Sequence, residues 1–211
     1  MEVFDFLGSV AVPLPIPNLN TDVIVRVERL TSLQRTELGP YAFEALRYRA
    51  DGTEDPGFIL NRAPFREAKI LVAGENFGCG SSREGAVWAL MDLGIRCVIA
   101  PSFGEIFFNN CFHNGMLAIA LPAPVVATLL DDAASERIFQ VDLPRQQIRI
   151  SSCIVPFSVD PVRKEFLLRG LDGIGLTLRA AERIAHWQAN DRRQRPWAWA
   201  VEETGNDPPS R

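Results

Sequence analysis

The chain has 211 residues, of which 47% are apolar and 23% are charged, and its net charge is −4. This length suits one compact domain with extensions, and the composition is ordinary for a globular protein. The negative net charge argues against a general nucleic-acid binder, which carries a basic stripe, but it allows a small anion pocket built from a few arginines.

The first third of the chain shows few regular patterns. Residues 3–22 alternate apolar residues with turn formers, including three closely spaced prolines, and predict a short strand followed by an irregular loop. A second short strand is predicted at 23–27. An amphipathic helix is predicted at 41–49, and the segment 51–57 has the composition of a loop.

Three apolar strands alternate with three helical segments in the centre of the chain. The strands are predicted at 69–74, 97–101 and 117–121, and the helices at 81–93, 103–112 and 125–134. A glycine-rich turn at 75–80 joins the first strand to the first helix. This alternation with short connections predicts a parallel sheet with packed helices, so the expected fold class is α/β.

The C-terminal third predicts a hairpin and two helices. The hairpin strands are expected at 139–141 and 147–150 with a segment at 157–159 pairing nearby, and the helices at 161–171 and 176–190. The remaining residues, 191–211, are polar and are expected to form a mobile tail. We therefore expect one domain at 1–190, followed by this tail.

No segment resembles a membrane span or a secretion signal. The longest apolar stretch, 116–130, is interrupted by Pro122 and Pro124. The first five residues are acidic where a signal peptide is basic. We expect a cytoplasmic protein that binds neither a membrane nor nucleic acid.

The four cysteines, Cys79, Cys97, Cys111 and Cys153, show no C-x-x-C spacing. Structural zinc sites and bacterial iron–sulfur motifs usually have that spacing. The pattern argues against a metal site within this chain, although cysteines scattered in sequence can converge in space. Reduced thiols are expected rather than disulfides.

The segment 74–84 contains the densest group of candidate site residues. It follows a predicted strand and opens a predicted helix, where free backbone N–H groups and the positive end of the helix dipole favour an anion. Ser81 and Ser82 add hydroxyl groups, and Arg83 adds a planar guanidinium that matches a carboxylate. These residues predict a binding site for a small carboxylate or phosphate.

Two nucleotide-binding loops do not fit this segment. A Walker loop requires a lysine after its second glycine, and a dinucleotide fingerprint requires a third glycine that is absent here. A plainer alternative is that Ser81 or Ser82 caps the helix, with Glu84 as the partner in a capping box. Capping and anion binding are compatible with each other.

The run ENFGCGSSRE at 75–84 resembles the signature of the aconitase superfamily, in the form found in isopropylmalate dehydratase small subunits. Four other regions resemble that family in the same order, at 18–24, 35–39, 98–112 and 160–178, and the match extends from about residue 10 to about residue 197. The resemblance implies a swivelling β/β/α domain, with a mainly parallel sheet, packed helices and a smaller β layer.

The resemblance also implies a reaction and the residues that perform it. In the family, the residue at the position of Ser81 is the base that removes a proton from the substrate carbon. The positions of Ser82 and Arg83 bind a substrate carboxylate. The reaction dehydrates and rehydrates 2-isopropylmalate to 3-isopropylmalate through an unsaturated diacid, in leucine biosynthesis.

Three residues outside this loop belong to the implied site. Asp22 is expected to orient an arginine, for which Arg35 is the favoured partner. Thr21 lies beside Asp22 and is expected to shape the pocket. In the family, the departing hydroxyl meets a [4Fe–4S] cluster held by a separate large subunit. The resemblance therefore implies a large-subunit partner, a small diacid substrate and no cofactor bound by this chain.

The chain departs from the family pattern at four positions. Gly85 stands where the family usually has a histidine, Val87 and Arg26 each replace a proline, and Asn20 replaces an aspartate. Two alternatives therefore stay open. The chain is a subunit of a related hydratase acting on another diacid, of the citraconate or homoaconitate type, or it is a diverged subunit without catalytic activity.

Overall fold

A computed structural model describes residues 1–199 of the chain. The chain divides into two compact units, Met1–Asp172 and Gly173–Arg211, and the second is described as far as residue 199. Each unit is considered by itself below.

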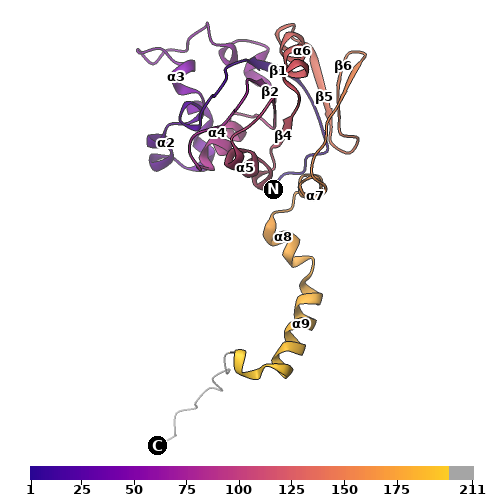
Figure 1. Ribbon diagram of the computed structural model, residues 1–211. Helices are drawn as coiled ribbons and strands as arrows, with labels where there is room; N and C mark the ends of the chain where they lie inside the picture. Colours follow the sequence, from indigo (N-terminus) through magenta and orange to yellow (C-terminus); the bar gives the residue numbers. More distant parts are fainter. Residues whose placement is uncertain (200–211) are drawn as a thin grey trace, which may run out of the picture. The chain divides into compact units, whose positions relative to one another are not determined.

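The first unit is built on a mixed sheet of seven strands in the order β4-β3-β2-β1-β5-β6-β7 (Figure 1). The strands are β1 (Phe6–Leu14), β2 (Ile70–Ala73), β3 (Cys97–Ala100), β4 (Leu117–Ala120), β5 (Ile138–Asp142), β6 (Gln147–Ile150) and β7 (Cys153–Pro156). Neighbouring strands from β4 to β1 are parallel, and those from β1 to β7 are antiparallel. The predicted parallel sheet and smaller β layer are confirmed.

Strand β1 belongs to both parts of the sheet. Its second half pairs with β2 in the register Ala11↔Ile70, and its first half pairs with β5 in the register Val10↔Ile138. All residues of β2 and β3 are buried and apolar, as expected for parallel strands covered on both faces. The centre of the hydrophobic core therefore lies on the parallel part of the sheet.

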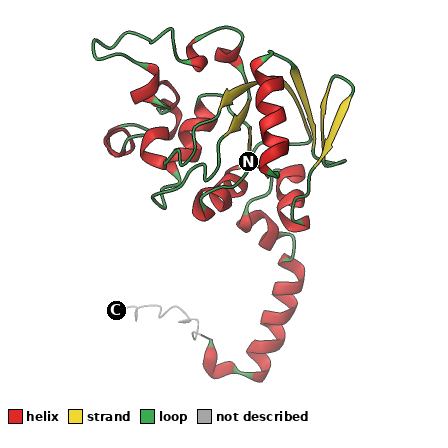
Figure 2. Ribbon diagram, turned by 45° about the horizontal axis from the view of Figure 1, so that its top comes forward, coloured by secondary structure: helices red, strands yellow, loops and turns green. Residues whose placement is uncertain are grey.

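The four longest helices of this unit are α4 (Gly85–Asp92), α5 (Glu105–Asn114), α6 (Ala123–Ala134) and α7 (Pro161–Arg169). Helix α6 packs on β1 and β2, whereas α4 and α5 pack on each other away from α6 (Figures 1 and 2). The Asp160 side chain caps α7 by accepting from two backbone N–H groups, and Gly115 ends α5 in the left-handed conformation. The helices expected near 103–112, 125–134 and 161–171 are confirmed.

The predicted strand at 23–27 is wrong, because Val23 and Ile24 end one helix and Val27 begins another, with only Val25 and Arg26 extended between them. Helix α1 (Thr21–Ile24) begins after Asn20, whose side-chain oxygen accepts the N–H of Val23, and α2 (Val27–Ser32) follows. A side-chain cap of this kind outweighs the strand preference of valine and isoleucine.

Residues 35–67 form short helical turns joined by loops. They are η1 (Arg35–Glu37), η2 (Gly39–Tyr41), α3 (Glu44–Arg47), η3 (Ile59–Asn61) and η4 (Phe65–Glu67). The helix predicted at 41–49 is therefore limited to one turn. Phe43 precedes that turn in the left-handed conformation, with φ at 57°, and interrupts the helix.

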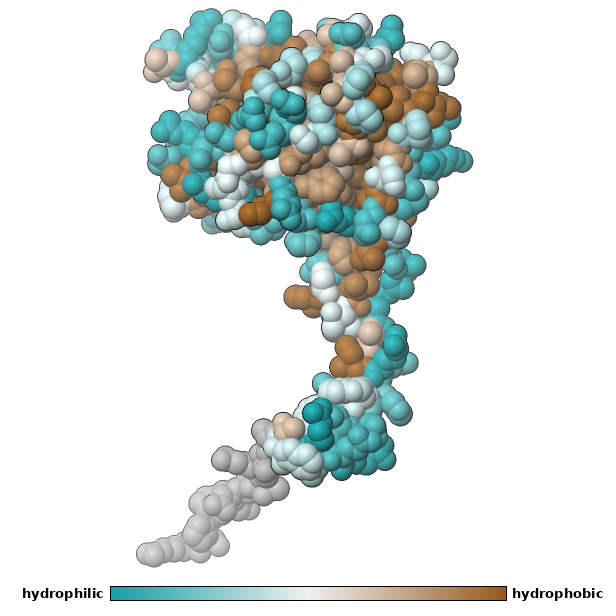
Figure 3. Space-filling model, in the orientation of Figure 1, coloured by the Kyte–Doolittle hydropathy of each residue, from teal (hydrophilic) through white to brown (hydrophobic). Residues whose placement is uncertain are grey.

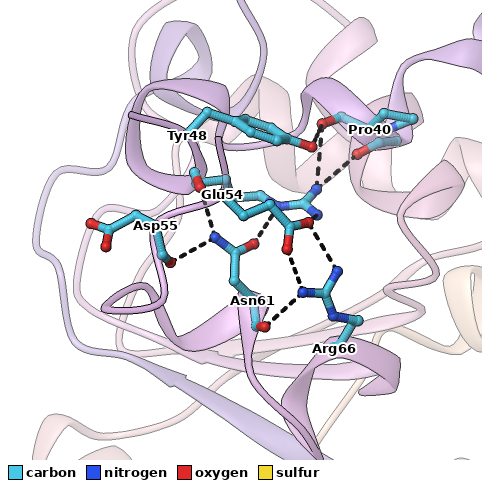
Figure 4. Close-up of polar contacts among 8 residues, drawn as sticks. Pro40, Tyr48, Glu54, Asp55, Asn61 and Arg66 are labelled. Carbon is cyan, nitrogen blue, oxygen red and sulfur yellow. Dashed lines mark hydrogen bonds and ion pairs between the residues drawn. The ribbon is translucent and has the colours of Figure 1, made fainter. Parts of the chain in front are cut away.

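A buried arginine holds this loop region together (Figure 4). Arg47 is 5% exposed, and its Nε donates to Asn61 Oδ1 at 3.2 Å. The Asn61 amide donates in turn to the backbone carbonyls of Arg47 and Asp55, and Arg66 donates two hydrogen bonds to the Glu54 carboxylate. Because the buried polar atoms are paired, the network closes the loop without leaving an isolated charge.

Two of the C-terminal predictions need correction. The strand expected at 157–159 lies at 153–156, as β7. The helix expected at 176–190 is two helices, α8 (Gly173–Leu178) and α9 (Ala181–Gln194), followed by η5 (Pro196–Ala198). The expected boundary at residue 190 falls inside α9, and residues 200–211 of the predicted mobile tail lie outside the described residues.

The second unit has little core of its own. Within residues 173–199 only Asp191 is buried. Ile174, Leu178 and Trp187 are more than half exposed, and Figure 3 shows apolar side chains at the surface of this unit. None of the described helices combines the length and the apolar character that crossing a bilayer requires.

Gly78 tests how tightly the loop after β2 is packed. A Cβ atom there would lie 2.2 Å from Phe107 Cγ, and its φ is +72°. We expect Gly78→Ala to lower the free energy of unfolding by about 3 kcal/mol, through overpacking and backbone strain. Chemical unfolding of the isolated chain measures this loss.

Gly52→Ala is the matched control. Gly52 has a similar φ of +81°, but no atom lies within 4 Å of a Cβ placed there. We expect a loss of about 1 kcal/mol from backbone strain alone. Equal losses for the two variants would show that Phe107 does not press on Gly78.

Candidate functional site

The loop between β2 and α4 does not open directly into a helix. Helix α4 begins at Gly85 rather than at the predicted residue 81, and Glu84 occupies the cap position without a side-chain capping bond. The alternative in which Ser81 or Ser82 caps the helix is therefore wrong. The free N–H groups of the helix start lie beyond Ser81, so other groups determine the surroundings of its hydroxyl.

Backbone hydrogen bonds tie this loop to residues 18–21. The N–H of Asn18 donates to the carbonyl of Glu75 at 2.9 Å, and the N–H of Gly78 donates to the carbonyl of Leu19 at 2.8 Å. The next bond in the series runs from the N–H of Thr21 to the carbonyl of Cys79, also at 2.9 Å. These bonds bring the two segments side by side, although about sixty residues separate them in the sequence.

Thr21 contacts Ser81 through two hydrogen bonds. Its Oγ1 accepts the backbone N–H of Ser81 at 3.1 Å and lies 2.7 Å from Ser81 Oγ. Thr21 is 1% exposed, whereas Ser81 is half-buried. A buried threonine therefore fixes both the backbone and the side chain of the serine, while the serine stays accessible.

Arg83 pairs with Asp22, and this corrects the expected pairing of Asp22 with Arg35. The Nη1 of Arg83 donates to Asp22 Oδ1. About one third of the Arg83 side chain and more than half of the Asp22 side chain are exposed. Ser82, between Ser81 and Arg83, is exposed as well. Thr21, Asp22, Ser81 and Arg83 therefore form one contiguous surface group, with Ser82 beside it.

Arg35 lies on η1 and contacts other residues. Its Nη2 donates to Asn114 Oδ1 at 2.8 Å, and its guanidinium lies 5.2 Å from the centre of the Trp88 ring. Among the ion pairs of residues 1–199, none joins Arg35 to Asp22. Asn114 has no signal in the sequence beyond the end of a helix, which Asn114 and Gly115 together indicate.

A surface cavity of about 360 Å³ opens beside this group of residues. Asn20, Asp22, Arg26 and Val27 are among the residues that line it. Its walls therefore combine charged groups with apolar ones. The Arg26 guanidinium in this lining is paired with Glu28, 3.5 Å away.

The cysteines do not assemble a metal site in the part of the chain that is described. Cys97 and Cys111 are buried in the core, and desolvation raises the pKa of both thiols. Cys79 donates to the carbonyl of Asn18, and Cys153 is exposed on β7. No three ligand-type side chains (His, Cys, Asp or Glu) among residues 1–199 are grouped around one point. The described residues do not fit an iron–sulfur cluster.

Comparisons with known proteins agree on one family. Residues 1–124 match the family model of the aconitase C-terminal domain. The chain is 53% identical over 201 residues to the 3-isopropylmalate dehydratase small subunit of Rhodospirillum centenum, which covers 94% of this chain and 99% of that protein. It is also 53% identical over 200 residues to the subunit of the same name in Paramagnetospirillum magneticum, with 93% and 100% of the two chains covered.

A solved structure agrees with these relatives. The crystal structure of a 3-isopropylmalate dehydratase from Methanocaldococcus jannaschii is similar to this chain, with a TM-score of 0.65 and 27% sequence identity. The match covers 86% of this chain and 99% of that one. The similarity therefore extends over nearly all of the solved chain.

The burial of the thiols predicts their reactivity in the isolated, folded chain. A raised pKa leaves less thiolate at any pH, and buried sulfur is also inaccessible. We expect iodoacetamide at pH 8 to modify Cys153 first and to leave Cys97 and Cys111 unmodified, as measured by mass spectrometry of peptides. All four thiols react after unfolding, which is the control. Rapid native labelling of Cys97 would contradict the described core.

Proposed function

The chain belongs to the family of 3-isopropylmalate dehydratase small subunits, and on this basis we propose that its Ser81 removes the proton from the substrate carbon. A protein of this family is a hydro-lyase subunit, which isomerises 2-isopropylmalate to 3-isopropylmalate by dehydration and rehydration in leucine biosynthesis. The observation that supports Ser81 as the base is its pair of hydrogen bonds with the buried Thr21.

Ser81 needs strong assistance to act as a base. Bringing a free serine hydroxyl near neutrality means lowering its pKa by roughly 6 units, or about 8 kcal/mol. A helix terminus contributes at most ~2 kcal/mol, and less here because α4 begins four residues beyond Ser81. Hydrogen-bond donors, cationic side chains and exclusion of water must provide the rest.

Thr21 supplies one such donor. Either hydroxyl can donate in the hydrogen bond between Thr21 Oγ1 and Ser81 Oγ, which lie 2.7 Å apart, but once Ser81 has lost its proton only Thr21 can be the donor. A hydrogen bond donated to the alkoxide form stabilises that form and lowers the pKa of the serine. In this proposal, Thr21 holds the serine in place and favours its proton-accepting state.

Arg83, Ser82 and Arg35 bind the carboxylates of the diacid substrate. Asp22 holds one Nη of Arg83, which leaves the other N–H groups of the guanidinium for a substrate carboxylate. Ser82 lies next to Arg83 and adds a hydroxyl donor. Arg35 is exposed and donates one Nη to Asn114, so the other edge of its planar guanidinium is available to a second carboxylate.

The large subunit completes this site. Ser81 and Arg83 are partly exposed, so a partner must cover them before water is excluded from the reaction. We place the [4Fe–4S] cluster on the large subunit, because no three ligand-type side chains gather around one point among residues 1–199. The proposal also makes the enzyme cytoplasmic, since its relatives are named as subunits of a metabolic dehydratase.

Activity with the large subunit tests the function. The two chains are purified together without oxygen and assayed with isopropylmalate, citraconate and homoaconitate. We expect turnover of isopropylmalate, and we expect Ser81→Ala to lower kcat by about 10³-fold, as is typical for the loss of a general base.

Ser152→Ala is the matched control, because Ser152 lies in an exposed turn before β7. We expect it to leave kcat unchanged. Full activity of Ser81→Ala would refute the assigned base. Turnover of citraconate or homoaconitate alone would assign the chain to the related hydratases, and inactivity on all three acids would favour a non-catalytic subunit.

Thr21 is tested by two substitutions of similar size. Thr21→Val keeps the shape of the side chain and removes its hydroxyl, so we expect kcat to fall about 30-fold, as for a lost hydrogen bond to a charged group. The pKa of Ser81 rises without this donor, so the pH at which kcat/KM is half-maximal moves upward. Thr21→Ser keeps the hydroxyl and is expected to keep most of the activity. An unchanged pH profile in Thr21→Val would show that Thr21 does not act on the ionisation of Ser81.

A further inference from the structure

Asn114 is a buried polar residue with contacts in several elements. It is the last residue of α5, and Gly115 follows it in the left-handed conformation with φ at 86°. Asn114 is only 5% exposed. A polar side chain that is buried to this degree requires partners for all of its donors and acceptors.

The amide of Asn114 is fully paired. Its Oδ1 accepts from Arg35 Nη2 at 2.8 Å and from Trp88 Nε1 at 3.1 Å. Its Nδ2 donates to Glu84 Oε1 at 2.5 Å and to the backbone carbonyl of Asn110 at 2.9 Å. Arginine and tryptophan can only donate, so the orientation of the amide is fixed.

These bonds connect Arg35 on η1 with the end of the loop between β2 and α4. This loop carries Ser81 and is called the serine loop below. Glu84 follows Arg83 directly and is the cap residue of α4, and Trp88 lies one turn further along the same helix. The guanidinium of Arg35 is held over the Trp88 ring and toward the Asn114 oxygen at the same time. A planar group fixed at its face and at one edge has little rotational freedom.

We propose that Asn114 is a positioning residue, which fixes the guanidinium of Arg35 relative to the serine loop so that its remaining N–H groups face a substrate carboxylate. This rests on the proposed function, in which Arg35 binds substrate. Asn114 itself contacts neither the substrate nor Ser81. It acts through Arg35 on one side and through Glu84 on the other.

Two substitutions separate positioning from general stability. Asn114→Asp retains the acceptor for Arg35 and Trp88 but places a carboxylate against Glu84, whereas Asn114→Ser is too short to reach Arg35. If Asn114 has only a structural role, Asn114→Asp places two buried carboxylates in contact, and this variant should be both less stable and weaker in substrate binding than Asn114→Ser. Positioning predicts that the aspartate variant is less stable but binds substrate better.

Kinetics of the complex with the large subunit provide the test. We expect Asn114→Ser to raise KM for 2-isopropylmalate about 10-fold with kcat within about 3-fold of wild type, and Asn114→Asp to raise KM by less than about 3-fold. In an Arg35→Ala background, Asn114→Ser is expected to change kcat/KM by less than about 2-fold. Additive effects of the two substitutions, or an equal KM for the serine and aspartate variants, overturn the proposal.

Asn109→Ser is the matched control on the same helix. Asn109 accepts a hydrogen bond from Arg163 at 2.7 Å, so the substitution removes an asparagine–arginine contact of the same kind. The Arg163 guanidinium lies over the rings of Phe108 and Phe112. We expect Asn109→Ser to leave KM at the wild-type value.

A second measurement does not depend on activity. The side-chain NMR signal of Arg35 in the isolated full chain, assigned by its loss in Arg35→Ala, reports how freely the guanidinium rotates. We expect hindered rotation in wild type and Asn114→Asp, and free rotation in Asn114→Ser. Free rotation in wild type overturns the proposal. If the wild-type complex turns over no diacid, the proposed function fails, while this signal still decides whether Asn114 holds Arg35.

Discussion

The hydrogen bonds between residues 18–21 and the loop after β2 bring Thr21 and Asp22 beside Ser81 and Arg83. Strands β1 and β2 are parallel neighbours, so their carboxyl ends meet at the same edge of the sheet, and the chain leaves both strands side by side. The bond from the Thr21 N–H to the Cys79 carbonyl then places the threonine hydroxyl beside Ser81. The serine would be an ordinary surface residue without this alignment of two distant segments.

The parts of the fold that were predictable are those set by local pattern. Apolar runs of four or five residues between turn signals identified β2, β3 and β4, and glycine identified the end of α5. The strand predicted at 23–27 failed, because Asn20 provides a cap that the valine-rich sequence does not reveal. The helix predicted from residue 81 failed for the opposite reason. The Ser81 hydroxyl bonds to Thr21, a partner that is distant in sequence, and not to the backbone ahead of it.

The candidate site was predictable in its members but not in its pairings. The motif resemblance selected Thr21, Asp22, Ser81, Ser82 and Arg83, and the structure places them together. The resemblance also suggested Arg35 as the partner of Asp22, whereas in the structure Asp22 binds Arg83. Spacing within a motif indicates which residues gather near one edge of a sheet, but the choice among several arginines depends on side-chain reach in three dimensions. Asn114 has no motif of its own, because its four bonds go to η1, to α4 and its cap residue, and to the preceding turn of its own helix.

The double role of β1 has a consequence for how the protein is made. The half of β1 that pairs with β5 meets its partner only when residues 138–142 have left the ribosome, more than a hundred residues after β1 itself. Until then, residues 6–10 form an open strand edge that is available to other chains. Such long-range pairing slows folding, and it exposes the nascent chain to aggregation for as long as the edge is unpaired. The strand that unites the two parts of the finished sheet is therefore also the part of the growing chain most in need of protection by chaperones.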